Sequence, residues 1–142
     1  MNTESEVSKA RNGLRVNAIF IIGFLVIQYA LGMISNMFVQ FPDTSDAGQL
    51  WEFARSQFAT GTHILIGTLL LLGAVVFVIR TVRAKVGGWI ASSVVGLIAI
   101  AAAFYGGVMF ISSQVDAYSM VMALAFIVAF LAYGWGLYAD RG

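Results

Sequence analysis

Four long apolar stretches, separated by short polar segments, make up most of the chain. They cover residues 16–39, 59–79, 89–112 and 117–138, and none contains Asp, Glu, Lys or Arg. A membrane-spanning helix needs roughly 20 consecutive apolar residues, whereas a membrane-spanning β-strand needs only about ten of alternating polarity. The pattern therefore predicts an all-α membrane protein, an up-down-up-down bundle of four transmembrane helices within residues 16–138.

Lysine and arginine are distributed unevenly about these spans. Only Arg55 lies between the first and second spans; the others are Lys9, Arg11, Arg15, Arg80, Arg83, Lys85 and Arg141. These seven share one side of the bundle, and cytoplasmic loops carry the excess of basic residues. We therefore expect both termini in the cytoplasm, with residues 1–15 as a polar N-terminal segment and residues 139–142 as a short tail. Short loops and small size favour a prokaryotic cytoplasmic membrane.

The longest segment between spans, residues 40–58, is expected on the outer side. Pro42 ends the first helix because proline lacks a backbone N–H and disfavours a helical residue before it. Asp46, with Gln49 three residues later, resembles a capping box and predicts a short helix over residues 47–57. Its apolar side, resting at the outer membrane interface, would contain Leu50, Trp51, Ala54 and Phe58. A plain connecting loop anchored by Trp51 is the alternative.

Composition narrows the classes of function. The chain is 60% hydrophobic and 11% charged, against about 25% charged residues in soluble domains, so a lipid bilayer is the expected surroundings. The net charge of +1 argues against a nucleic-acid partner. Without cysteine, a thiolate metal site is excluded. A hydrolase is not expected, because no carboxylate lies within a span to orient the only histidine, His63.

The residues with ligand chemistry gather in the outer half of the predicted bundle. His63 lies about one turn inside the second span, and Gly67, one turn deeper, leaves space beside the imidazole for another backbone or a flat ligand. The methionines after the initiator lie in the same half: Met33, Met37, Met109, Met120 and Met122. Imidazole and thioether groups ligate heme iron and copper, and bundles place such ligands on facing helices.

A structural role is the alternative for the same residues. Methionine fills irregular gaps between helices. A single histidine can also be a packing residue, with its ring hydrogen-bonded by Gln28, Asn36 or a backbone carbonyl. The sequence leaves both interpretations open, although an ionisable residue within a span is by default a candidate for function.

Two segments resemble one four-helix half of a heme A synthase: residues 26–32 (VIQYALG) and residues 62–67 (THILIG). The resemblance implies histidine ligands near the outer ends of the second and fourth helices. His63 matches the first position, whereas the fourth helix has no histidine and Met122 is the nearest substitute, so a His63/Met122 pair is the implied heme ligation. The family's acidic residue before the second-helix histidine and its cysteine pair are absent, which argues against heme A synthase activity.

Four functional hypotheses follow from these observations. The first is a heme-binding protein for electron transfer or heme handling, and the second is a copper-handling protein that uses His63 and the five methionines. The third is a non-catalytic subunit or assembly factor that packs against another membrane protein, or against itself, through the small residues at 96–107 and 134–136. A transporter or channel is disfavoured because the spans lack charged groups. We favour a redox cofactor, heme above copper, in the outer half.

Overall fold

The computed structural model describes residues 3–139, with side chains from Ser8 onward. The described chain forms five helices: α1 (Thr3–Phe38), α2 (Ala47–Ser56), α3 (Phe58–Ala84), α4 (Gly87–Ser113) and α5 (Asp116–Ala139). By length and composition, α1, α3, α4 and α5 can each cross a membrane. The predicted all-α fold with four spans is thus confirmed, and the protein is a small polytopic membrane protein. Most of the expected tail, residues 140–142, lies outside the described residues.

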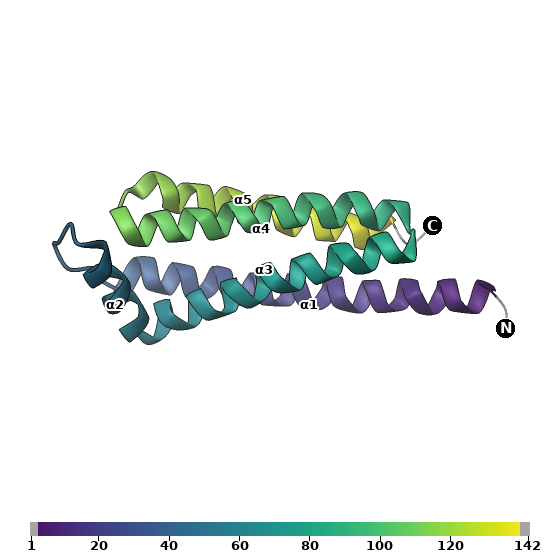
Figure 1. The fold of residues 1–142 in the computed structure, drawn as a ribbon, viewed down its shortest axis with the longest axis horizontal. Helices are drawn as coiled ribbons and strands as arrows, with labels where there is room; N and C mark the ends of the chain where they lie inside the picture. The colour runs from purple at the N-terminus through teal and green to yellow at the C-terminus, as the bar shows by residue number, and fades with distance from the viewer. Residues whose placement is uncertain (1–2, 140–142) are drawn as a thin grey trace.

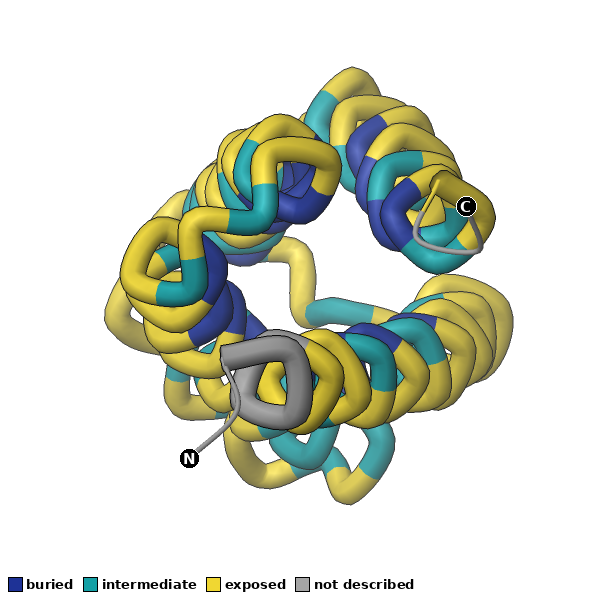
Figure 2. Tube along the Cα trace, turned by 90° about the vertical axis from the view of Figure 1, so that its right-hand side faces the viewer, coloured by how far each residue is buried: buried dark blue, intermediate teal, exposed yellow. Residues whose placement is uncertain are grey.

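The four long helices form a ring in the order α1, α3, α4, α5 (Figures 1 and 2). Each helix packs against the next one in this order, and α5 closes the ring against α1. The start of α1 and the end of α5 lie at the same end of the bundle, as four crossings require (Figure 1). The basic residues of the α3–α4 turn lie at this end too, and the excess of positive charge predicts that it faces the cytoplasm.

The helices extend beyond the apolar stretches. α1 begins at Thr3 rather than at Val16, and its 36 residues correspond to a length of about 54 Å. The hydrocarbon core is only about 30 Å thick, so the first turns of α1 extend beyond it. Similarly, α3 continues past Ile79 to Ala84. Hydropathy marks where the hydrocarbon ends, whereas the hydrogen-bonded helix continues into the polar residues beyond it.

The short helix predicted in the outer loop is present as α2, and Asp46 caps it; the Asp46 backbone N–H, which a capping box would pair with the Gln49 side chain, donates instead to the Thr44 hydroxyl at 3.2 Å. One carboxylate oxygen of Asp46 accepts hydrogen bonds from the backbone N–H groups of Gly48, at 2.8 Å, and Gln49, at 3.3 Å. The Gln49 side chain donates to the other carboxylate oxygen at 3.4 Å. Because the first turn of a helix has N–H groups without helical partners, this cap fixes where α2 begins.

The apolar side of α2 packs on protein rather than on the membrane interface. Leu50 and Ala54 are buried against α3 and α4, and the Trp51 indole donates a hydrogen bond to the Ser112 hydroxyl at 3.0 Å. Phe58 departs from the expected apolar side, because it begins α3 and is 86% exposed. α2 therefore lies across the outer ends of α3 and α4 (Figure 1).

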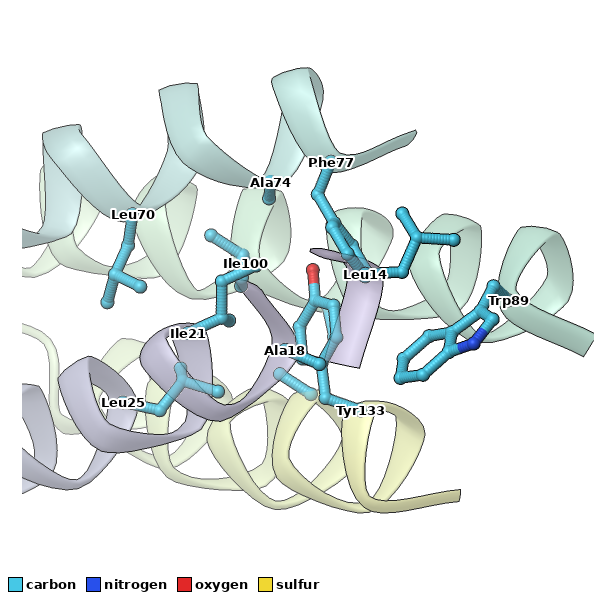
Figure 3. Packing of buried hydrophobic residues seen from close by; sticks show 12 residues of the cluster. Leu14, Ala18, Ile21, Leu25, Leu70, Ala74, Phe77, Trp89, Ile100 and Tyr133 are labelled. Carbon is cyan, nitrogen blue, oxygen red and sulfur yellow. The ribbon is translucent and has the colours of Figure 1, made fainter. Parts of the chain in front are cut away.

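The hydrophobic core lies in the half of the bundle nearest the termini. It contains Leu14, Ala18, Ile21, Leu25, Leu70, Ala74, Phe77, Trp89, Ala99, Ile100, Ala129 and Tyr133. The Phe77 ring is central: its centroid lies 5.8 Å from the Trp89 ring and 5.8 Å from the Tyr133 ring (Figure 3). All four long helices contribute to this cluster, which joins them into one body.

Glycines let α4 and α5 approach closely beside the core. A Cβ atom on Gly96 would lie 2.5 Å from Cζ of Tyr133, and one on Gly136 would lie 2.7 Å from Cζ3 of Trp89. Neither glycine could become alanine without movement of a buried aromatic ring. Gly96 and Gly136 belong to the small residues expected to contact another membrane protein, but they pack within the bundle instead.

Candidate functional site

Buried side chains are more numerous in the inner half of the bundle than in the outer half. The buried side chains of α1 end at Leu25, those of α5 begin only at Ala125, and in α3 Thr60 alone is buried before Leu70. Figure 1 shows α3 and α4 diverging toward the end that carries α2. The outer half of the four long helices therefore holds few fully buried side chains, among them Thr60 of α3 and Ile111 of α4.

His63 and Gln28 join α3 to α1 at this outer level by two reciprocal hydrogen bonds. The Gln28 side-chain amide donates to the backbone carbonyl of His63 at 2.9 Å. Nδ1 of His63 lies 3.0 Å from the backbone carbonyl oxygen of Gln28. Each residue thus uses its side chain to bond the main chain of the other. Interhelical bonds of this kind contribute about 0.6 kcal/mol on average in membrane bundles.

The hydrogen bond at Nδ1 assigns the tautomer of the His63 ring. A carbonyl oxygen can only accept, so Nδ1 must carry the hydrogen. In the neutral ring the other nitrogen, Nε2, then has its lone pair free. Nε2 forms no hydrogen bond with the described residues, yet it is not among their fully buried, unpartnered atoms. Metal-ligating histidines have this arrangement, in which one ring nitrogen donates to an oxygen and the other binds the metal.

Two glycines make room for the pair. A Cβ on Gly32 would lie 3.0 Å from Cε1 of His63, and a Cβ on Gly67 would lie 2.8 Å from Nε2 of Gln28. Each glycine is one turn beyond the polar residue on its own helix, so the pattern is the same on α1 and α3. The space predicted beside Gly67 is therefore taken by the Gln28 side chain, and the His63 ring lies against Gly32.

The side-chain oxygen of Gln28 is left without a partner. Oε1 is buried and accepts no hydrogen bond from the described residues. The amide orientation is fixed, because only the nitrogen can donate to the His63 carbonyl. An unpaired buried acceptor costs about 1–3 kcal/mol, so this polar cluster is incompletely satisfied by the chain itself.

Met122 lies on α5, at a depth similar to that of His63. Tyr29 of α1 stacks on Phe126 of α5 with ring centroids 4.8 Å apart, and Met122 and Gly32 lie about one turn outward from this stack. A Cβ on Gly107 would lie 3.3 Å from the Met122 sulfur, so the thioether rests on α4. His63 and Met122 thus belong to the same layer, but to different interfaces, α1–α3 and α4–α5.

The remaining predicted methionine ligands do not share one environment. Met33 is 41% exposed, and Met37 and Met120 are each 66% exposed, whereas Met109 is only partly exposed. Within residues 3–139, no group of three or more His, Cys, Asp or Glu residues is placed to hold a metal ion.

A second polar layer, in the inner half, is not part of the predicted site. The Thr81 and Ser93 hydroxyls lie 2.9 Å apart, and the Ser92 hydroxyl donates to a carbonyl of α5, that of Ala132, at 2.6 Å. Thr81 lies beyond the predicted end of the second span, which is why hydropathy does not indicate this pair. The layer joins α3, α4 and α5 and is a structural feature of the core.

No family model matches the sequence, and neither a curated protein nor a solved structure is similar to it.

Proposed function

We propose that this protein binds heme in the outer half of its bundle, with His63 Nε2 as the iron ligand. The observation that carries the proposal is the hydrogen bond from Nδ1 to the Gln28 carbonyl, because it leaves the Nε2 lone pair free. The resemblance of residues 26–32 and 62–67 to a heme A synthase half agrees with the same chemistry.

The residues present fit a heme with one strong ligand and one weaker candidate. His63 would hold the iron, and the Gln28 carbonyl would keep the imidazole in the ligating tautomer. Met122 is the proposed second ligand, since it lies in the same layer on the helix across the ring. A bound heme would supply one-electron redox chemistry. The His63/Met122 pair would favour electron transfer, because two protein ligands leave no open position for substrate.

Copper is less well supported than heme. Cu(I) sites need several soft ligands around one ion, and three of the five candidate methionines have largely exposed side chains. The heme proposal requires only His63 and one thioether. We therefore expect the purified protein to bind heme but not Cu(I).

Titration of the purified, detergent-solubilised protein with hemin tests the proposal. We expect a saturable Soret band with an endpoint of one heme per chain, because there is a single histidine. Parallel addition of Cu(I) under reducing conditions should leave no bound copper after desalting. Hemin absorbance that rises without saturation, or no shift relative to hemin in detergent alone, would overturn the proposal.

The two methionines of α5 provide a matched test of the second ligand. Met122 is partly buried against α4, whereas Met120, two residues away, is 66% exposed. We expect Met122→Ala to lower the heme reduction potential, because a thioether ligand raises it, and Met120→Ala to leave it unchanged. Spectroelectrochemical titration measures both. Equal potentials in the two variants would exclude Met122 as a ligand.

A non-catalytic subunit of a larger membrane complex is the second candidate. Gly23 on α1 and Gly73 on α3 are exposed, and a Cβ on either would meet nothing within 4 Å. Small residues on a membrane-facing surface permit close approach of another helix. Purification of crosslinked protein from intact membranes tests this role: a defined partner at stoichiometric amount would support it, and an uncrosslinked monomer would count against it.

A further inference from the structure

A contact between α1 and α3 at the basic end of the bundle places an arginine side chain on a bare helix surface. The Arg80 guanidinium extends to α1, where its Nη2 would be 3.6 Å from a Cβ on Gly13. This is an ordinary contact distance, so a Cβ alone would fit, whereas a longer side chain at this position would meet the guanidinium. Lys9 lies one turn before Gly13 on α1, and Arg83 lies one turn after Arg80 on α3.

Among residues 8–139, whose side chains the structure describes, the acidic residues all lie at the opposite end of the bundle, so the three cations around this contact have no counter-charge there. Lys9, Arg80 and Arg83 are exposed, and none forms an ion pair or side-chain hydrogen bond with a described residue. Arginine presents a planar fork of donors that matches phosphate oxygens. The group that best complements the cluster is therefore an anion of this kind.

The position of the cluster relative to the membrane indicates where the anion comes from. Arg80 directly follows the apolar stretch that ends at Ile79, and Gly13 lies just before the one that begins at Val16. The guanidinium is thus at the boundary between hydrocarbon and headgroups, where the phosphates of the cytoplasmic leaflet lie. Next to it, Val16 and Ile79 are 50% and 45% exposed and would contact acyl chains.

We propose that Arg80, resting on Gly13 and flanked by Lys9 and Arg83, binds the phosphate of an anionic phospholipid in the inner leaflet. The site is independent of heme, since it lies at the opposite end of the bundle from His63. It differs from general attraction to a charged membrane because it depends on the open surface at Gly13. A substitution there that leaves every charge in place should therefore weaken binding.

Native mass spectrometry of the full chain with phosphatidylglycerol or phosphatidylcholine tests the site. We expect preferential binding of phosphatidylglycerol, weakened about fivefold by Arg80→Gln and by a similar factor by Gly13→Leu, whose side chain would displace the guanidinium. Arg55→Gln removes a charge at the other end, and Gly23→Leu adds the same side chain to an open part of α1. Both controls should bind like the unmodified protein.

Three results would overturn the proposal. The first is equal binding of the two lipids. The second is loss of binding in Arg80→Gln without loss in Gly13→Leu, which would indicate diffuse charge attraction. The third is displacement of phosphatidylglycerol by millimolar inorganic phosphate, which would assign the cluster to a free anion. Because Arg80 is exposed, its replacement should leave the fold intact, and a thermal unfolding curve checks this.

Discussion

Replacing Gly96 with alanine is expected to lower the free energy of unfolding by about 1–3 kcal/mol, the usual cost of overpacking a core. The added Cβ would lie 2.5 Å from Cζ and 2.8 Å from the hydroxyl oxygen of Tyr133. Tyr133 cannot move away easily, since it is fully buried and its ring packs against Phe77. The substitution must therefore displace the aromatic cluster or separate α4 from α5.

Gly73→Ala is the matched control, because it makes the same change within a long apolar helix. Gly73 is exposed, with nothing within 4 Å of its Cβ position. Alanine there should leave stability unchanged or raise it, because alanine has the higher helix propensity. Unfolding in mixed micelles of increasing dodecyl sulfate content, followed by circular dichroism, compares the two variants. Equal stability of Gly96→Ala and Gly73→Ala would contradict the packing of Tyr133 on Gly96.

Replacing His63 with alanine is expected to abolish heme binding, because the chain has no other histidine. The fold should persist, since the substitution removes only the bond of the imidazole with the Gln28 carbonyl, outside the core cluster, whereas the Gln28 side chain can still donate to the backbone carbonyl of residue 63. Thr68→Ala on the same helix is the control: the Thr68 hydroxyl bonds only the Ile64 carbonyl of its own helix, so heme binding should be retained. Hemin titrations of the unmodified protein, His63→Ala and Thr68→Ala compare their heme binding.

Rescue by imidazole separates ligand loss from damage to the fold. In His63→Gly, added imidazole should occupy the space beside Gly32 and restore part of the Soret band. The same addition should have no effect on Thr68→Ala. A His63→Gly protein that binds hemin as tightly as the unmodified chain, without imidazole, would remove His63 from the site.

The fold follows from the sequence because lipid imposes a simple rule. Backbone polar groups must bond within the segment that crosses the membrane, so four apolar stretches without charges predict four helices. The Asp46 cap can also be predicted from the sequence, because it depends on residues only three positions apart. The helix ends are less predictable: hydropathy marks residue 79, whereas α3 ends at Ala84.

The packing of the site depends on how the helices are aligned along and around one another, and hydropathy does not determine this alignment. Gln28 is recognisable as an inward polar residue, but its two bonds with His63 exist only because α1 and α3 align Gly32 with the imidazole. Likewise, Met122 and Met120 look equivalent in sequence. They differ in burial because only Met122 falls on the side of α5 that faces Gly107.

The absorption spectrum of the protein freshly purified from heme-sufficient cells tests the central claim most directly. We expect a Soret band that remains with the folded protein through gel filtration and sharpens, with resolved α and β bands, on reduction by dithionite. Colourless protein that is folded by circular dichroism and unfolds cooperatively would contradict it.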